Sequence, residues 1–265
     1  MTTINFAHAN GFPAPSYQTF FSALNEHITS PINIIAKHQY AHDPQYPIVN
    51  NWEHQVSELI DYIKLTASEP VIGIGHSFGA VITYLAACRE PELFKAVVLC
   101  DPPLITGIGG SMFEGLKIFG LMDHVTPAKR TKQRKQRWDL GEDISQYFSH
   151  KSLFKNFDPQ CIQDYVASAT QIVGDVQQLT FNVDVEVGIF RTIPTNLHKY
   201  YGQCKLPGLL LTGTHTNVTL PVFVKPFIKG NPSIEQATVS GGHLFVFEEP
   251  ELTAVQISEF IQRLD

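Results

Sequence analysis

The sequence predicts a protein of the α/β class, with a mostly parallel sheet of about six strands covered by helices on both faces. Short apolar runs alternate with longer segments of helical periodicity, which is the first observation behind this prediction. The second is a break in the alternation between about Leu104 and Lys205, which indicates an inserted segment. The length of 265 residues suits one large domain with such an insertion.

Six short apolar runs are the predicted strands. In chain order they are TINFAHA, INIIAKH, PVIGIGH, KAVVLCD, PGLLLTG and IEQATVS. Because helical segments separate most of them, the chain must cross over between strands, and crossover connections produce a parallel sheet. The carboxyl ends of such strands share one edge of the sheet, where we expect the functional site.

Four segments carry apolar residues at helical spacing: SYQTFFSALNEHI, NWEHQVSELIDYIKL, GAVITYLAACRE and PELTAVQISEFIQRL. In the last of them, Leu252, Val255, Phe260 and Leu264 are expected on one side of the helix. These segments are the predicted helices of the core, which comprises residues 1–104 and 205–265.

Residues 105–204 are interpreted as a helical cap inserted between two strands of the core. Three stretches of this segment suggest helices: FEGLKIFGLM, PAKRTKQRKQRWDL and DPQCIQDYVASATQIV. The basic run from Lys129 to Arg137 is most simply a solvated helix face. The alternative is contact with an anionic group, such as a phosphorylated acyl carrier or an acidic membrane surface.

Composition excludes several classes of function. The net charge of −6 and pI near 6.0 argue against a nucleic-acid partner. No apolar run approaches the length of a membrane span, so no stable membrane insertion is expected. The first residues show no signal peptide and the four cysteines form no CxxC pair, which predicts a cytoplasmic protein. Neither a metal-ligand spacing nor a glycine-rich phosphate loop is present, so we expect no metal and no cofactor.

The stretch Gly75-His76-Ser77-Phe78-Gly79 lies between a predicted strand and a predicted helix. This GxSxG pattern in this context predicts a nucleophile elbow, in which a tight turn exposes the serine. The glycines leave room for the turn, and the free N–H groups of the helix N-terminus favour developing negative charge. Ser77 is therefore the candidate nucleophile. The alternative is a glycine-flanked turn with an inert serine.

A nucleophilic serine needs a base, and His243 is the candidate. It follows the last predicted strand in the stretch SGGHLFVFEEP, and two glycines before it allow the loop to bend over the strand ends. A surface or capping histidine is the alternative.

The base in turn needs an acid, and the usual position is empty. In many proteins of this architecture the acid follows the strand PGLLLTG, but no Asp or Glu occurs between Glu186 and Glu235. Asp101 instead ends the strand KAVVLCD, the first predicted strand after the nucleophile. We expect it to orient His243, the alternative being a structural cap before Pro102 and Pro103.

An oxyanion hole would complete the site. One expected donor is the backbone N–H of Phe78, and the other comes from the loop HANGFPAPSY, with Asn10 preferred over Phe12. The alternative for this loop is a simple structural turn. Three apolar residues near the expected site, Phe12, Leu104 and Leu244, are the candidate substrate contacts.

With HANGFPAPSY, GHSFGA and GGHLF in this order, the chain resembles the α/β-hydrolase superfamily. It is most similar to small serine hydrolases with a helical cap, such as esterases and lipases. The resemblance covers residues 2–104 and 205–265, and the cap matches only in placement. Haloalkane dehalogenases and epoxide hydrolases of this fold use an aspartate nucleophile, so Ser77 argues against both. We expect the sheet to lack the superfamily's two usual N-terminal strands, as in plant methyl esterases and hydroxynitrile lyases.

The resemblance implies a serine hydrolase that cleaves carboxylic esters through an acyl-enzyme intermediate. The expected partner is a small ester with an apolar acyl or alkyl group, because the cap stretch SMFEGLKIFGLM is apolar. Two alternatives remain open. One is a ligand receptor or regulator with little turnover, and the other is a hydroxynitrile lyase or thioesterase with the same triad.

Overall fold

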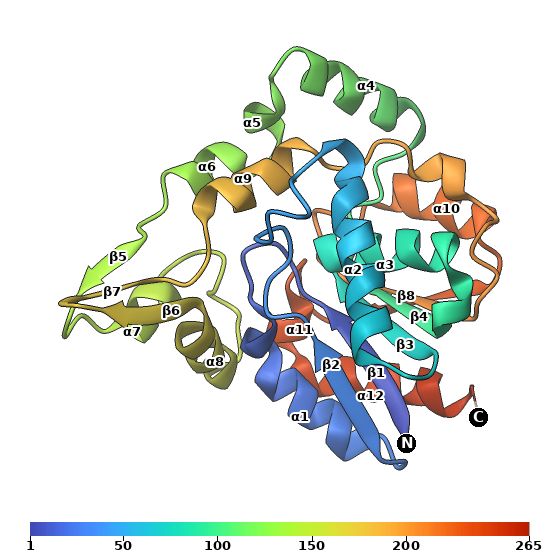
Figure 1. The fold of residues 1–265 in the computed structure, drawn as a ribbon, viewed down its shortest axis with the longest axis horizontal. Coiled ribbons are helices and arrows are strands. Elements are labelled where there is room, and N and C mark those ends of the chain that lie inside the picture. Colours follow the sequence, from blue (N-terminus) through green and yellow to red (C-terminus); the bar gives the residue numbers. More distant parts are fainter. Residues whose placement is uncertain (265) are drawn as a thin grey trace.

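A six-stranded parallel sheet forms the centre of the chain in a computed structural model that describes residues 1–264 (Figure 1). Its strands are β1 (Thr2–Ala7), β2 (Ile32–Ala36), β3 (Val71–His76), β4 (Phe94–Cys100), β8 (Gly208–Gly213) and β9 (Ile234–Val239). They lie in the order β2-β1-β3-β4-β8-β9, and every neighbouring pair is parallel. This confirms the predicted fold class and all six predicted strands.

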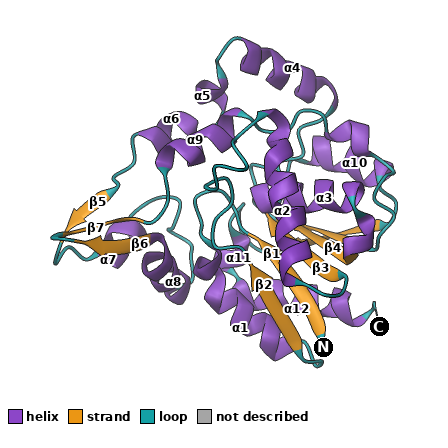
Figure 2. Cartoon of the chain, viewed as in Figure 1, coloured by secondary structure: helices purple, strands orange, loops and turns teal. Residues whose placement is uncertain are grey.

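Helices cover both faces of this sheet (Figure 2). One face carries α1 (Gln18–His27), α11 (Phe245–Glu248) and α12 (Pro250–Gln262), and the other carries α2 (Glu53–Thr66), α3 (Phe78–Arg89) and α10 (Pro221–Gly230). Successive residues of β4 contribute to different cores: Ala96 and Val98 pack toward α1 and α12, whereas Val97 and Leu99 pack toward α2 and α3. Burial on both faces explains why the strands are continuous apolar runs.

Helix α12 forms where the sequence predicts it, and two of the four residues expected on one side, Phe260 and Leu264, pack in or against the core. Leu252 is 50 % exposed, while Ala254, Ile257 and Ile261 are buried against the sheet. The small Ala254 lets the helix approach the sheet closely, and the four-residue spacing from Ile257 to Ile261 sets the buried stripe. The expectation for Leu252 was therefore wrong.

The segment between β4 and β8 lies beyond the carboxyl ends of the central strands (Figure 1). Its helices are α4 (Gly107–Ile118), α5 (Met122–Val125), α6 (Ala128–Lys132), α7 (Ile144–Ser149), α8 (Pro159–Ala169) and α9 (Val183–Arg191). A small antiparallel sheet, which the sequence did not predict, has the order β5-β7-β6 and comprises β5 (Arg137–Asp139), β6 (Thr170–Val173) and β7 (Val176–Leu179).

This small sheet corrects the interpretation of two stretches as helices throughout. Helix α6 ends at Lys132 and helix α8 ends at Ala169, and a strand follows each. Strands β6 and β7 are joined at Gly174, whose φ of 64° is left-handed, and Val173 pairs with Val176 across this turn. Gly-Asp between two runs of strand formers is a hairpin signal that the helical interpretation overlooked.

None of the helices in residues 1–264 combines the length and the apolar character that crossing a bilayer requires.

Candidate active site

Ser77 lies in a strained turn between β3 and α3. Its φ of 55° and ψ of −116° are rare for a residue with a side chain. The Ser77 N–H donates to the carbonyl of Cys100 over 2.8 Å, which ties the turn to the end of β4. This conformation presents the Ser77 side chain, which is partly exposed, at the carboxyl edge of the sheet.

The two glycines of the elbow are required by close backbone contacts. A Cβ atom at Gly75 would lie 2.4 Å from the carbonyl oxygen of Gly79. A Cβ at Gly79 would lie 2.0 Å from the carbonyl oxygen of Ala7, at the end of β1. The elbow therefore packs directly against the strand that leads into the loop of residues 8–13, which we call the oxyanion loop.

The structure brings Ser77, His243 and Asp101 into one hydrogen-bonded chain. His243 lies in the loop after β9, and its Nε2 is 2.9 Å from the Oγ of Ser77. Its Nδ1 is 2.7 Å from Oδ2 of Asp101. Because the carboxylate accepts, Nδ1 carries the proton and Nε2 is free to accept the Ser77 hydroxyl proton. The His243 side chain is 21 % exposed, whereas the Asp101 side chain is fully buried.

Asp101 is held by the end of β8 and by the loop after it, which contains no carboxylate. The N–H of Gly213 donates to Oδ1 over 3.1 Å, and the hydroxyl of Thr216 donates to Oδ2 over 2.5 Å. With His243, the buried carboxylate accepts three hydrogen bonds, which compensate for its loss of hydration. The backbone of Asp101 is also left-handed, with φ 47°, and its N–H donates to the carbonyl of Leu211. The loop after β8 thus supplies donors to an acid on the neighbouring strand.

The oxyanion loop makes a tight turn next to the elbow. The N–H of Phe12 donates to the carbonyl of Ala9 over 3.1 Å, and Gly11 has the left-handed φ of 78° that such a turn requires at its third position. Within residues 1–264, the backbone N–H groups of Asn10 and Phe78 donate to no acceptor. Asn10 is therefore the expected donor that stays free, while the N–H of Phe12 is engaged in the turn.

The three candidate substrate contacts are nearly buried. Phe12, Leu104 and Leu244 are 6 %, 2 % and 4 % exposed. The ring of Phe12 lies 5.0 Å from Phe247 and 5.2 Å from Tyr165, between the core and the inserted segment. Leu104 packs with the core beneath α2 and α3, and Leu244 packs on the opposite side of the sheet with Phe12.

A buried network behind the elbow was not predicted from the sequence. The N–H of Ala9 donates to the hydroxyl of Tyr17 over 3.0 Å, and this hydroxyl lies 2.9 Å from Nδ1 of His76. The Nε2 of His76 lies 3.0 Å from the carbonyl of His243. Since a carbonyl only accepts, Nε2–H donates and Nδ1 accepts the proton of Tyr17. Burial, aided by the neighbouring His243, lowers the pKa of His76 to about 3, so the ring is neutral.

A second unpredicted cluster joins the inserted segment to the oxyanion loop. Arg134 donates from Nη1 to both carboxylate oxygens of Glu186, over 3.2 and 2.9 Å, and from Nη2 to the hydroxyl of Tyr165 over 2.9 Å. The Arg134 and Glu186 side chains are only 21 % and 9 % exposed. Burial raises the pKa of Glu186, and Arg134 opposes that rise. The interpretation of the basic run as a solvated face is therefore wrong for Arg134, although Lys129, Arg130, Lys132 and Arg137 are exposed.

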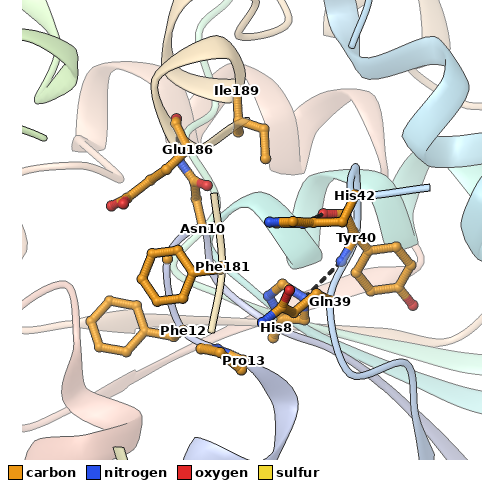
Figure 3. Close-up of a pocket in the computed structure, with 11 residues that line it drawn as sticks. His8, Asn10, Phe12, Pro13, Gln39, Tyr40, His42, Phe181, Glu186 and Ile189 are labelled. Carbon is orange, nitrogen blue, oxygen red and sulfur yellow. Dashed lines mark hydrogen bonds between the residues drawn. The ribbon is translucent and has the colours of Figure 1, made fainter. Parts of the chain in front are cut away.

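Figure 3 shows a small pocket beside the oxyanion loop, facing Glu186 and Phe181 of the inserted segment. His8 lies at its base, where Nδ1 donates to the carbonyl of Ala9 and Nε2 accepts the N–H of Tyr40. Burial lowers the pKa of His8 to about 4, so this ring is also neutral. Across residues 1–264, no group of three or more His, Cys, Asp or Glu side chains is arranged to hold a metal ion.

Comparisons with known proteins agree with this architecture. The model of the alpha/beta hydrolase family matches residues 6–256. An abhydrolase domain-containing protein, AFT2-1, from Alternaria alternata is 20% identical to this chain, and the match covers 74% of this chain and 84% of that protein. The crystal structure of E-2-(acetamidomethylene)succinate hydrolase superposes with a TM-score of 0.80 at 19% identity, covering 98% of this chain and 91% of that one. A thioesterase domain from the curacin biosynthetic pathway superposes with a TM-score of 0.73 at 13% identity, covering 97% of this chain and 90% of that one.

Proposed function

Because the chain belongs to the alpha/beta hydrolase family, we propose that it is a serine hydrolase that cleaves carboxylic esters through an acyl-enzyme intermediate. The observation that carries this proposal is the hydrogen-bonded chain from Ser77 through His243 to Asp101. It supplies a nucleophile, a base and an orienting acid in the geometry that acyl transfer requires.

In the first half of the proposed reaction, the Oγ of Ser77 attacks the ester carbonyl carbon while Nε2 of His243 takes the hydroxyl proton. Asp101 keeps the imidazole in the required tautomer and stabilises the imidazolium. The oxyanion that forms accepts hydrogen bonds from the free N–H groups of Phe78 and Asn10. His243 then returns the proton to the leaving alcohol, and Ser77 remains acylated.

In the second half, water replaces the alcohol. The neutral His243 takes a proton from the water as it attacks the acyl carbon, and the same oxyanion donors stabilise the new tetrahedral intermediate. Collapse of this intermediate breaks the bond to Ser77, which regains its proton from His243, and the carboxylic acid leaves. No cofactor takes part in this scheme.

We retain residues 105–204 as a cap over this site. The segment leaves the core after β4, at the carboxyl edge that also presents Ser77, and Figure 1 shows its helices beyond this edge. The side chains of Phe113 and Leu116 in α4 and the aromatic cluster around Phe12 favour a small ester with an apolar acyl or alkyl group.

Hydrolysis of p-nitrophenyl esters from acetate to palmitate, compared between the wild type and Ser77→Ala, tests the proposal. We expect multiple turnovers for the wild type, a preferred chain length that reports the size of the acyl site, and loss of nearly all turnover in Ser77→Ala. Activity retained in Ser77→Ala would reject the mechanism. A wild type that turns over no ester or thioester would favour a receptor or a lyase.

A further inference from the structure

We propose that Arg134 and Glu186 are positioning residues that hold the oxyanion loop in its active conformation from the inserted segment. This inference rests on the proposed function, since it concerns how the oxyanion donor at Asn10 is kept in place. It assigns to the cap a part in transition-state stabilisation, besides that of covering the substrate.

Three successive residues of the oxyanion loop contact this cluster. The side-chain Nδ2 of Asn10 donates to the backbone carbonyl of Glu186 over 2.9 Å. Gly11 lies against the Glu186 carboxylate, so closely that a Cβ there would be 2.6 Å from Oε1. The ring of Phe12 lies 5.2 Å from Tyr165, which accepts from Arg134. In the view of Figure 3, Glu186 lies directly above Asn10.

The position of the Glu186 carboxylate is itself fixed by Arg134. The two hydrogen bonds from Nη1 hold both carboxylate oxygens, and the bond from Nη2 to Tyr165 fixes the guanidinium plane. The guanidinium also stacks on Phe181, 5.3 Å from the ring centre. A mostly buried pair of this kind has few alternative arrangements, because separating the two charges leaves each of them without compensation.

The positioning role predicts an effect on kcat that is separate from any effect on KM. An oxyanion donor contributes only when it lies within hydrogen-bond distance of the position that the oxyanion reaches in the transition state. Loosening the loop should therefore reduce kcat and leave ground-state binding, and hence KM, almost unchanged. A merely structural pair would affect stability without this separation of kcat from KM.

The test compares Arg134→Gln, Arg134→Lys and Glu186→Gln with a control ion pair of the inserted segment. Arg191 lies on α9, the helix of Glu186, and donates to both oxygens of Asp123 in α5, over 2.7 and 2.6 Å. On p-nitrophenyl esters we expect Arg134→Gln and Glu186→Gln to lower kcat on the order of 10- to 100-fold, with KM within about threefold. Arg134→Lys keeps the charge and should lose less, and Asp123→Asn and Arg191→Lys should stay within about twofold of the wild type.

Two further readouts distinguish a loosened oxyanion loop from a general loss of folded protein. Inhibition by a boronic acid, which mimics the tetrahedral intermediate, should weaken in proportion to kcat, while inhibition by the product carboxylate should not change. Amide hydrogen exchange in a peptide covering residues 9–17 should become faster in Glu186→Gln and not in Asp123→Asn, and this readout needs no activity.

The outcomes separate the two proposals. If the Arg134 and Glu186 variants have the same kcat and the same loop exchange as the control variants, the positioning role is overturned and the hydrolase proposal stays intact. If the wild type hydrolyses no ester, the ester hydrolase proposal is rejected. Faster amide exchange of the loop in Glu186→Gln would still support the contact between Glu186 and the oxyanion loop.

Discussion

Asp101 is the residue on which the proposed triad depends most. It is fully buried, yet it follows β4 and not β8, after which the acid lies in many proteins of this architecture. Its oxygens accept hydrogen bonds from Gly213, Thr216 and His243, so its negative charge is compensated from three directions. The donors at Gly213 and Thr216 explain how the loop after β8 works without a carboxylate of its own.

We therefore expect Asp101→Asn to lower kcat on the order of a thousandfold or more, with KM little changed, because the amide favours the wrong tautomer of His243. Steady-state hydrolysis of the preferred p-nitrophenyl ester measures this. Glu235→Gln is the matched control, since Glu235 is an exposed acid at the start of β9 that pairs with Arg263. An Asp101→Asn variant as active as this control would show that His243 works without Asp101.

At the scale of elements, Tyr17 connects parts of the core that meet only in the folded chain. It lies at the end of a short 3₁₀ helix, η1 (Ala14–Tyr17), and its hydroxyl bridges the N–H of Ala9 and the ring of His76. His76 continues the chain to the backbone of His243. One hydroxyl therefore links the oxyanion loop, the strand before the elbow and the loop of the proposed base.

Removing this hydroxyl in Tyr17→Phe leaves two buried polar groups, the N–H of Ala9 and Nδ1 of His76, without a partner. We expect the free energy of unfolding to fall by about 2–4 kcal/mol, measured by urea denaturation. In the control, Tyr46→Phe, the lost hydrogen bond to Asp61 is exposed, and the expected change is below about 1 kcal/mol. A Tyr17→Phe variant as stable as Tyr46→Phe would contradict the role assigned to this network.

The elements themselves were predictable to different degrees. The central strands are buried on both faces, so an apolar run alone identifies them. In the inserted segment, the three strands are short and partly exposed, and only the Gly174 turn distinguishes β6 and β7 from a continuing helix. The buried face of α12 depended on how closely Ala254 approaches the sheet, which periodicity does not specify.

At the scale of the whole molecule, two buried neutral histidines make stability depend on pH. Burial lowers the pKa of His8 to about 4 and that of His76 to about 3, while in the unfolded chain both titrate near the ordinary histidine pKa of 6.5. Below pH 6.5 the unfolded state therefore binds more protons than the folded state. The stability contributed by these rings is fully present above pH 6.5 and is lost as the pH falls toward 4 and 3.

Between pH 7.5 and 5, we expect each of these two histidines to reduce the free energy of unfolding by about 2 kcal/mol. Urea denaturation at both pH values, for the wild type and for His76→Gln, measures the share of His76. Glu58 and Glu186, whose pKa values burial raises, act in the opposite sense, so the difference between the two proteins is the quantity to compare. Equal losses in the wild type and in His76→Gln would contradict the prediction.

By itself, the sequence determined the α/β fold class, the six strands and the elbow at Ser77, because apolar runs and a glycine-flanked serine are local patterns with local causes. It also indicated His243 and Asp101, since parallel strands bring their carboxyl ends to one edge and few other candidates lie there. Only the tertiary structure decided which groups surround them. The contacts of Tyr17 with His76, of Arg134 with Glu186, and of Glu186 with Asn10 join residues 52 or more positions apart. No periodicity records such a contact, because it forms only when segments that are distant in the chain pack together.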